Sequence, residues 1–157
     1  MNDLICIIPA RSGSKRIKNK NILNFFGIPF LGRTIITAKK SKIFDKIIVS
    51  SDSKKILEIG KKYGAINLGL REKKYSGDRV TTDDLLLREI NKNKLNTYKY
   101  ICCIYPATPL LKSEHLKKAL QKTIRSDIDL FVTSGAISAG KFDFIPKLIT
   151  KLGFKTY

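Results

Sequence analysis

The sequence has few acidic residues for its many basic ones, a single histidine and no long apolar run. Its 13 Asp and Glu stand against 31 Lys and Arg, which gives a formal net charge of +18. With His115 alone and no nucleophile motif, a catalytic triad or a histidine metal site is not expected. No apolar run approaches the ~20 residues that span a bilayer, and the start Met1–Leu4 lacks the basic segment of a signal peptide. We therefore expect a cytoplasmic protein with no membrane contact.

Cysteine is also scarce, and its spacing does not suggest a metal or redox motif. Cys6, Cys102 and Cys103 all lie within apolar, strand-like runs, and no Cys-x-x-Cys pair occurs. Buried, reduced thiols are the expected state of all three.

The basic excess has two interpretations. It could mark a nucleic-acid-binding surface. However, most of the cations are lysines scattered over segments that resemble exposed helix faces, and there is no basic tail or arginine-rich tract. We therefore favour a general bias in composition, with no nucleic acid as partner, while noting that such a field attracts anionic substrates.

Strand-like apolar runs alternate with amphipathic segments along the chain. This alternation predicts βαβ units, a mostly parallel sheet and the α/β class. No repeat, low-complexity tract or linker divides the sequence, so residues 1–157 are expected to form a single domain. The strands are expected at 4–9, 46–50, 65–68, 100–105 and 129–134, the helices at 30–41, 53–63, 81–91 and 113–123, and a tight apolar turn at 24–29.

The loop that follows the first strand, residues 10–21, has the composition of an anion-binding site, and we call it the basic loop. Its cations are Arg11, Lys15, Arg16 and Lys20. Gly13, between Ser12 and Ser14, is expected to take a positive φ and turn backbone N–H groups inward as an anion-binding nest. A solvated basic turn is the alternative, but ligands of open α/β sheets bind at this end of the strands, which favours a triphosphate. The loop matches neither the Walker A motif nor G-x-G-x-x-G.

Three further loops follow the other predicted strands, at residues 51–53, 70–82 and 106–111. Right-handed crossovers would bring all of them to the same edge of the sheet as the basic loop. That edge is the predicted functional site.

These loops resemble those of the acylneuraminate cytidylyltransferases, the CMP-sialic acid synthetase family. The stretch Ile8–Ile17, followed by Lys20-Asn21-Ile22, is similar to the amino-terminal signature of the family. The stretches Ile48–Asp52 and Lys61–Ala65 also fit, and Cys102–Pro106 is most similar to the pseudaminic acid branch. The resemblance covers roughly residues 4–133.

The resemblance implies a Rossmann-like, three-layer nucleotidyltransferase fold in a nucleotide-binding domain that is typically dimeric. It also implies transfer of CMP from CTP to the anomeric hydroxyl of a nine-carbon sugar acid, pseudaminic or N-acylneuraminic acid, with release of pyrophosphate. Mg²⁺ would be bound mainly through the CTP phosphates. The partners implied are CTP, the sugar acid and a second copy of the chain.

The resemblance also assigns roles to individual residues. Arg11 and Lys20 would be catalytic, with Lys20 neutralising charge on the α-phosphate and the leaving pyrophosphate. The residues expected to bind nucleotide or substrate are Ser12, Gly13, Ser14, Lys15 and Arg16 at the triphosphate, Asn21 at the nucleotide, Arg71 and Thr82 near cytosine and ribose, and Pro106 and Thr108 over the base and the sugar-acid entry.

The sequence departs from the family in two respects. Members run to about half as long again, and their metal-binding aspartates and much of the sugar-acid pocket belong to a part beyond Tyr157, so the chain is expected to lack the family's carboxyl-terminal part and no metal ligand is assigned. In addition, Ala107 follows Pro106 where the family usually has a hydroxyl residue. Asp52 either reaches the site or caps a helix, and Asp78, Asp83 and Asp84 are expected in turns and caps.

Three functional hypotheses follow. The first is a cytidylyltransferase or the nucleotide-binding part of one, based on the basic loop. The second is a truncated, inactive relative that only binds nucleotide, based on the missing aspartates. The third is a basic nucleic-acid-binding module, based on the net charge alone.

Overall fold

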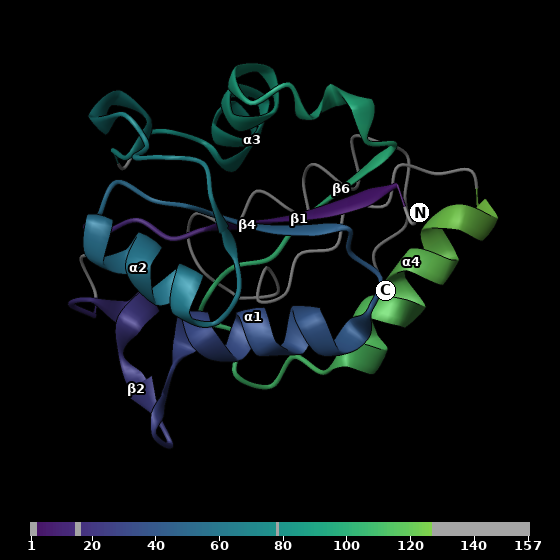
Figure 1. Cartoon of the computed structure of the whole chain (residues 1–157), viewed down its shortest axis with the longest axis horizontal. Helices are drawn as coiled ribbons and strands as arrows, with labels where there is room; N and C mark the ends of the chain where they lie inside the picture. Colours follow the sequence, from purple (N-terminus) through teal and green to yellow (C-terminus); the bar gives the residue numbers. More distant parts are fainter. Residues whose placement is uncertain (1–2, 15–16, 78, 127–157) are drawn as a thin grey trace.

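A parallel sheet forms the centre of the chain in this computed structural model, which describes residues 3–14, 17–77 and 79–126 (Figure 1). Its order is β5-β4-β1-β6, and every neighbouring pair is parallel. The strands are β1 (Leu4–Pro9), β4 (Lys46–Ser50), β5 (Ile66–Asn67) and β6 (Tyr100–Cys103). The predicted α/β class is confirmed.

Strand β1 lies between β4 and β6 and is buried on both faces. Ile7 of β1 pairs with Ile48 on one side and with Cys103 on the other. Its side chains alternate between two cores, since Cys6 and Ile8 belong to one apolar cluster and Ile5 and Ile7 to the other. An unbroken apolar run is what a strand covered on both faces requires.

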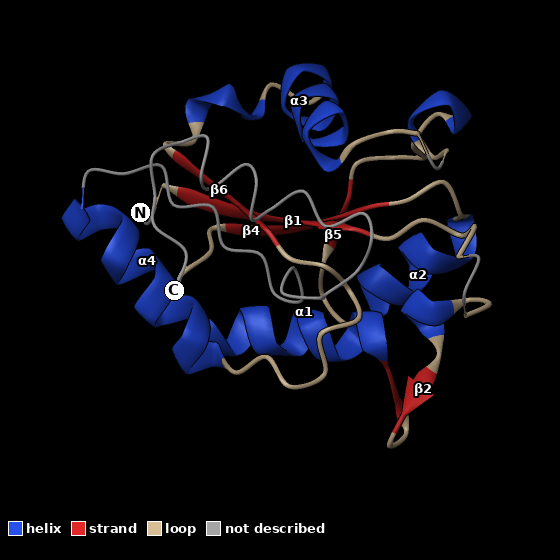
Figure 2. Cartoon of the chain, turned by 180° about the vertical axis from the view of Figure 1, so that it is seen from behind, coloured by secondary structure: helices blue, strands red, loops and turns tan. Residues whose placement is uncertain are grey.

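Helices cover both faces of this sheet and give three layers (Figure 2). The cluster that contains Cys6 and Ile8 also takes in Leu31 and Ile35, Ile56 and Leu57, and Leu116. These side chains come from α1 (Phe30–Ser41), α2 (Lys54–Lys62) and α4 (Ser113–Ser126). On the opposite face, α3 (Thr82–Lys92) packs with the 3-10 turn η3 (Leu95–Thr97). The predicted helices are confirmed to within a few residues.

The end of α2 illustrates how a single glycine sets a boundary. Tyr63 is the C-cap, and the next residue, Gly64, has φ of 92°. This left-handed conformation suits glycine because it has no Cβ. The predicted helix stop at Gly64 is therefore confirmed.

Two local predictions need correction. The turn expected at residues 24–29 is a small hairpin of β2 (Asn24–Phe25) and β3 (Ile28–Pro29), with positive φ at both Phe26 and Gly27. Two consecutive positive φ values suit the tight turn that joins antiparallel strands. Strand β6 ends at Cys103 and is only half-buried, whereas a fully buried strand was expected over 100–105.

The exposure of β6 has a simple cause in the described part of the chain, where β6 pairs with β1 alone and is therefore an edge strand. The strand expected at 129–134, together with the segment 135–157, lies outside the described residues.

The three cysteines are free thiols, as expected. Cys6 is buried, and burial raises its pKa, while burial raises the pKa of Cys102 to about 11 and that of Cys103 to about 12. Neutral thiols of this kind behave as small apolar side chains. Within the described residues, no helix combines the length and apolarity needed to cross a membrane.

Candidate functional site

The four predicted loops meet at the carboxyl edge of the sheet. Ser12 of the basic loop contacts Asp52 in the loop after β4, and the Arg71 backbone N–H donates to Ser51 O at 2.8 Å. Across the edge, the hydroxyls of Thr82 and Tyr105 lie 2.6 Å apart. The chain continues from β1 to β4 on one side, while β6 lies on the other, so this edge is a topological switch point, where open α/β sheets bind ligands.

Asp52 holds the basic loop in place. Its Oδ1 accepts from Ser12 N at 2.8 Å, and its Oδ2 accepts from Ser12 Oγ at 2.9 Å. Asp52 is therefore not a helix cap, because the N-cap of α2 is Ser53. Each carboxylate oxygen accepts one hydrogen bond from Ser12, and this pairing ties the loop after β4 to the basic loop.

Asn21 holds the backbone of the same loop. Its side chain is buried, at 4% exposed, and its Nδ2 donates to Arg11 O at 2.9 Å. The resemblance gave Asn21 a role in holding the nucleotide, and the structure places its amide against the loop backbone. Lys20, the first residue of the 3-10 turn η1 (Lys20–Ile22), is exposed.

The expected nest at Gly13 is not formed in the way predicted. Gly13 is absent from the residues with positive φ, and a Cβ at Gly13 would meet nothing within 4 Å. In the described part of this loop, the left-handed residue is Asn19, with φ of 55°. Ser12 and Gly13 are exposed and Ser14 is half-buried, while Lys15 and Arg16 lie outside the described residues.

Arg71 is a buried cation at this edge. It is 5% exposed, and its Nε donates to Ser76 Oγ at 3.1 Å. Burial lowers the pKa of Arg71, and the nearby carboxylates of Asp52 and Glu89 oppose that shift. Arginine stays protonated even so, which makes Arg71 a fixed positive charge between the two carboxylates.

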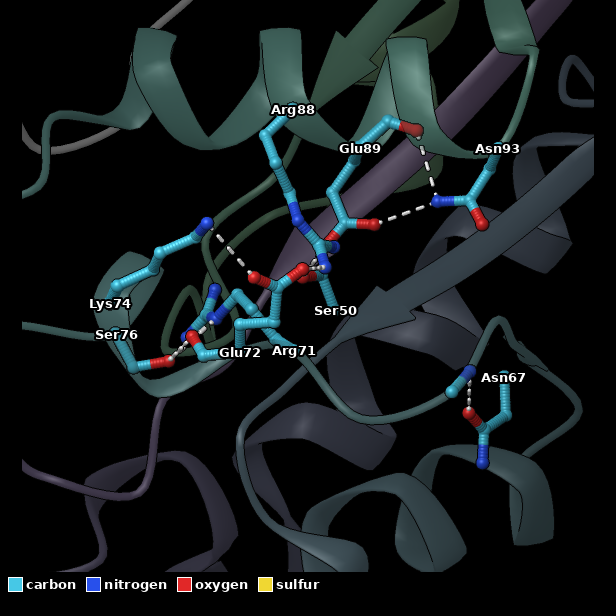
Figure 3. Close-up of polar contacts among 10 residues, drawn as sticks. Ser50, Asn67, Arg71, Glu72, Lys74, Ser76, Arg88, Glu89 and Asn93 are labelled. Carbon is cyan, nitrogen blue, oxygen red and sulfur yellow. Dashed lines mark hydrogen bonds and ion pairs between the residues drawn. The ribbon is translucent and has the colours of Figure 1, made fainter.

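A network of polar side chains joins β4, the loop 70–82 and α3 (Figure 3). Glu89 accepts through Oε1 from Ser50 Oγ at 2.7 Å and from Arg88 Nη1 at 2.9 Å. Its Oε2 accepts from Asn93 Nδ2 at 2.9 Å. Arg88 Nη2 then donates to Glu72 Oε1 at 2.7 Å. We call these side chains, together with Lys74, the α3 charge network.

The charges of this network stabilise one another. Hydrogen bonds from Arg88 and from Lys74, whose Nζ lies 3.2 Å from Glu72 Oε2, lower the pKa of Glu72. Burial alone would lower the pKa of Arg88, but the hydrogen bond to Glu72 and the charge of Glu89 outweigh it and raise that pKa. Such mutual pairing is the usual condition for burying ions.

The segment after β6 is anchored to α1. Thr34 Oγ1 donates to Pro106 O at 2.8 Å, and Thr108 Oγ1 donates to Tyr105 O at 3.1 Å. Pro106 is buried, whereas Tyr105 is 41% exposed and reaches Thr82. Tyr105 is therefore the side chain of this segment that faces the α3 side of the edge.

Glu89 and Tyr105 were not predicted at this edge, whereas Asp52 was expected either to reach the site or to cap a helix, and it reaches the site. For Glu89 a signal was available, because it lies four residues after Leu85 on the buried face of α3, where a carboxylate is out of place. For Tyr105 no comparable signal exists, since its contact with Thr82 joins segments 23 residues apart.

The described residues do not offer a protein ligand set for Mg²⁺. Among residues 3–14, 17–77 and 79–126, no group of three or more His, Cys, Asp or Glu side chains could hold a metal ion. The carboxylate nearest the basic loop, Asp52, is engaged by Ser12.

Comparison with known proteins gives close relatives with the same catalytic description. The family model described as cytidylyltransferase matches residues 5–143. Pseudaminic acid cytidylyltransferase of Campylobacter jejuni is 40% identical over 124 residues, covering 78% of this chain and 53% of that protein. N-acylneuraminate cytidylyltransferase of Streptococcus agalactiae is 36% identical over 158 residues, covering 98% of this chain and 36% of that protein.

A longer relative from Helicobacter pylori carries a second activity in its name. This "pseudaminic acid cytidylyltransferase and UDP-2,4-diacetamido-2,4,6-trideoxy-beta-L-altropyranose hydrolase" is 40% identical over 139 residues, covering 88% of this chain and 27% of that protein. The chain thus spans about half the length, or less, of these relatives.

Solved structures agree on the fold. The CMP:2-keto-3-deoxy-manno-octonic acid synthetase complexed with CTP matches with a TM-score of 0.67 at 18% identity, over 79% of this chain and 48% of that chain. A cytidylyltransferase from Leptospira borgpetersenii matches with a TM-score of 0.61 at 24% identity, over 79% of this chain and 50% of that chain. These structures support the fold, and the family match over residues 5–143 confirms the expected family: the chain belongs to the cytidylyltransferases.

Proposed function

We propose that this chain is the nucleotide-binding part of an enzyme that transfers CMP from CTP to a nine-carbon, sialic-acid-like sugar acid. The observation that carries the proposal is the edge where four loops meet, with the basic loop held by Asp52 and Asn21. The named activities of relatives at 36–40% identity support CTP as donor and pseudaminic or N-acylneuraminic acid as acceptor.

The chemistry requires positioning and positive charge more than a nucleophilic side chain. The anomeric hydroxyl oxygen of the sugar acid attacks the α-phosphorus of CTP and releases its proton to water. The bond from that phosphorus to the oxygen of the β-phosphate breaks, and pyrophosphate leaves with the electron pair. Arg11 and Lys20 would stabilise the negative charge that develops on the phosphates.

The base would lie against Arg71 and Thr82. A guanidinium is donor-only, and cytosine offers two adjacent acceptors, O2 and N3, whereas uracil carries an N–H at N3. A buried Arg71 therefore suits cytosine. Tyr105 adds a ring next to Thr82, and Pro106 and Thr108 would fix the segment that carries it.

Mg²⁺ enters this proposal as an ion carried by the CTP phosphates. An octahedral ion that keeps several waters is commonly held through phosphates and one or two carboxylates. The proposal also places the chain in the cytoplasm, where CTP is made, and includes pairing with a second copy, as in the family it resembles.

Calorimetric titration with CTP, UTP and ATP in the presence of Mg²⁺ tests the proposal. CTP is expected to bind most tightly, and a pyrophosphate-release assay with each sugar acid then tests turnover. Binding of CTP without release would favour the inactive relative. Absence of CTP binding, with salt-sensitive binding to RNA, would contradict the proposal and favour a basic nucleic-acid-binding module.

A further inference from the structure

The most buried carboxylate near the proposed site belongs to Glu89. It is 4% exposed and accepts hydrogen bonds from Ser50, Arg88 and Asn93. Taking a carboxylate out of water is costly unless it is paired and hydrogen-bonded. A leucine or isoleucine would fill this position of α3 without that desolvation cost. Packing alone therefore does not account for a carboxylate here.

Glu89 is connected through Arg88 to the loop that carries Arg71. Through Oε1 it orients Arg88, and Arg88 in turn holds Glu72, the neighbour of Arg71, at 2.7 Å. The Arg88 side chain is itself only 9% exposed, so it has little freedom to move away. Figure 3 shows this arrangement, with Glu72 and Arg71 on the same stretch of loop beside the Arg88 guanidinium.

Arg71 is held through its backbone N–H and its Nε. Its backbone is tied to Ser51 and its Nε to Ser76, and it forms no ion pair of its own in the described part of the chain. Every buried side-chain nitrogen or oxygen among the described residues has a hydrogen-bond partner. The terminal nitrogens of Arg71 have no hydrogen-bond partner among the described residues, so they are not completely buried and are available to a ligand.

The charges of both Glu89 and Arg88 act on the guanidinium of Arg71. Asp52 and Glu89 attract its guanidinium, while Arg88 and Arg11 repel it. Without the Glu89 carboxylate, the repulsion from Arg88 would no longer be balanced from the α3 side. A buried guanidinium in that state lowers its energy by turning toward water.

We propose that Glu89 is a positioning residue that aims Arg71 at the acceptor edge of cytosine, and that it thereby contributes to the choice of CTP over UTP. This inference rests on the proposed function. Glu89 does not touch the nucleotide and acts through Arg71 and through the contact of Arg88 with Glu72.

The variant Glu89→Gln tests this role because it keeps the size of the side chain and an acceptor for Ser50 while it removes the charge. Calorimetry on the full chain should show CTP affinity falling by about tenfold, which corresponds to the loss of one charge-assisted contact. UTP affinity should change much less, so the ratio of CTP to UTP affinity falls. The matched control is Glu58→Gln, which removes an exposed carboxylate on α2 and should leave the ratio unchanged.

A second variant guards against misfolding. Arg88→Gln combined with Glu89→Gln removes both charges of the pair together, so that no uncompensated ion is left between them. It should fold, as judged by circular dichroism and a cooperative melt, and should still show a reduced CTP to UTP ratio.

The outcomes separate the two ideas. If the folded variants keep the wild-type ratio, Glu89 is purely structural and this inference is overturned, while the proposed function stands. If the wild-type chain itself does not bind CTP, the proposed function fails and this inference fails with it. A lowered ratio in both variants, with Glu58→Gln unchanged, supports the positioning role.

Discussion

The basic loop and the α3 charge network both place charged side chains near one edge of the sheet. The charges of the network are paired within the protein, whereas Lys20 of the basic loop is exposed to solvent. In the network, Arg88 is bracketed by Glu72 and Glu89 and is almost fully buried. In the basic loop, Lys20 is exposed and forms no ion pair within the described residues. Buried ions require partners within the protein, whereas an exposed cation is available to a ligand. The network should therefore govern stability and, through Arg71, the choice of nucleotide, whereas the basic loop should govern binding of the phosphates.

The largest effect is expected from Arg88→Met, which leaves Glu89 buried without its cation. Breaking a buried pair from one side typically costs about 3–5 kcal/mol of unfolding free energy. Because Glu72 is 47% exposed and loses less, we expect a value near the lower end, about 3 kcal/mol. Chemical denaturation measures it.

The matched control is Arg79→Met, since Arg79 is exposed and has no ion pair in the described part of the chain. Its unfolding free energy should stay within about 0.5 kcal/mol of wild type. Equal losses of unfolding free energy in Arg88→Met and Arg79→Met would show that the charge of Arg88 does not contribute to stability and that only the apolar part of its side chain does, by packing.

The next effect is expected from Lys20→Met, and it should appear in binding. A hydrogen bond to a charged group contributes about 1.5–3 kcal/mol, so CTP affinity should fall by roughly tenfold to a hundredfold. Stability should hardly change, because Lys20 is exposed.

Calorimetry with CTP, set beside Lys18→Met, checks this expectation. Lys18 is an equally exposed lysine two residues earlier, and no site role is assigned to it. If both variants lose affinity to the same small extent, the loop attracts CTP only through its overall charge, and the specific role of Lys20 is wrong.

The difference between the two regions also explains what the sequence could predict. Apolar runs and helix caps are local patterns, so β1 and α1 were found where the structure has them, and the start of α3 was found to within one residue, with Thr81 as its N-cap. The loops could be placed at one edge because parallel strands bring their carboxyl ends together. The family resemblance rested on this same local level.

Contacts between segments that are distant in the sequence could not be predicted from local patterns. Asp52 was expected either to reach the site or to cap a helix, but its partner there, Ser12, lies 40 residues away in the sequence and could not be predicted. Gly13 suggested a positive φ that the backbone does not adopt, because freedom to take a conformation does not impose it. Glu89 could have been predicted from the helical periodicity of α3, because its spacing of four residues from Leu85 places a charged side chain on the buried face.

A smaller effect is expected from Asp52→Ala, which lies between the two regions. The change removes both bonds to Ser12 and should loosen the basic loop, lowering CTP affinity by about fivefold, or about 1 kcal/mol. It also removes a negative charge near the phosphates, which by itself favours binding. We expect the loss of order to outweigh that gain, because Asp52 holds both the backbone N–H and the hydroxyl of Ser12, at 2.8 and 2.9 Å.

The variant Asp52→Asn separates the two contributions. It removes the charge but keeps a side chain that can hydrogen-bond Ser12, so its CTP affinity should stay near or slightly above that of wild type. Titrations of both variants under one salt condition decide the matter. Tighter binding by Asp52→Ala than by wild type would mean that repulsion dominates and that Asp52 does not order the loop.

The smallest effect concerns the pH dependence of the α3 charge network at Glu72. The hydrogen bonds from Arg88 and Lys74 hold the pKa of Glu72 below its ordinary value of 4.5. A depressed pKa in the folded state means that the ionised carboxylate stabilises the fold above the ordinary pKa, and that this stabilisation is lost as the pH falls through the folded pKa.

The variant Glu72→Gln lacks this titration. The difference in denaturation midpoint between wild type and Glu72→Gln should be constant near about pH 7 and shrink toward about pH 3. A difference that stays constant over that range would show that Glu72 contributes through hydrogen bonds alone, and the network would then owe its stability to the buried pair of Arg88 and Glu89.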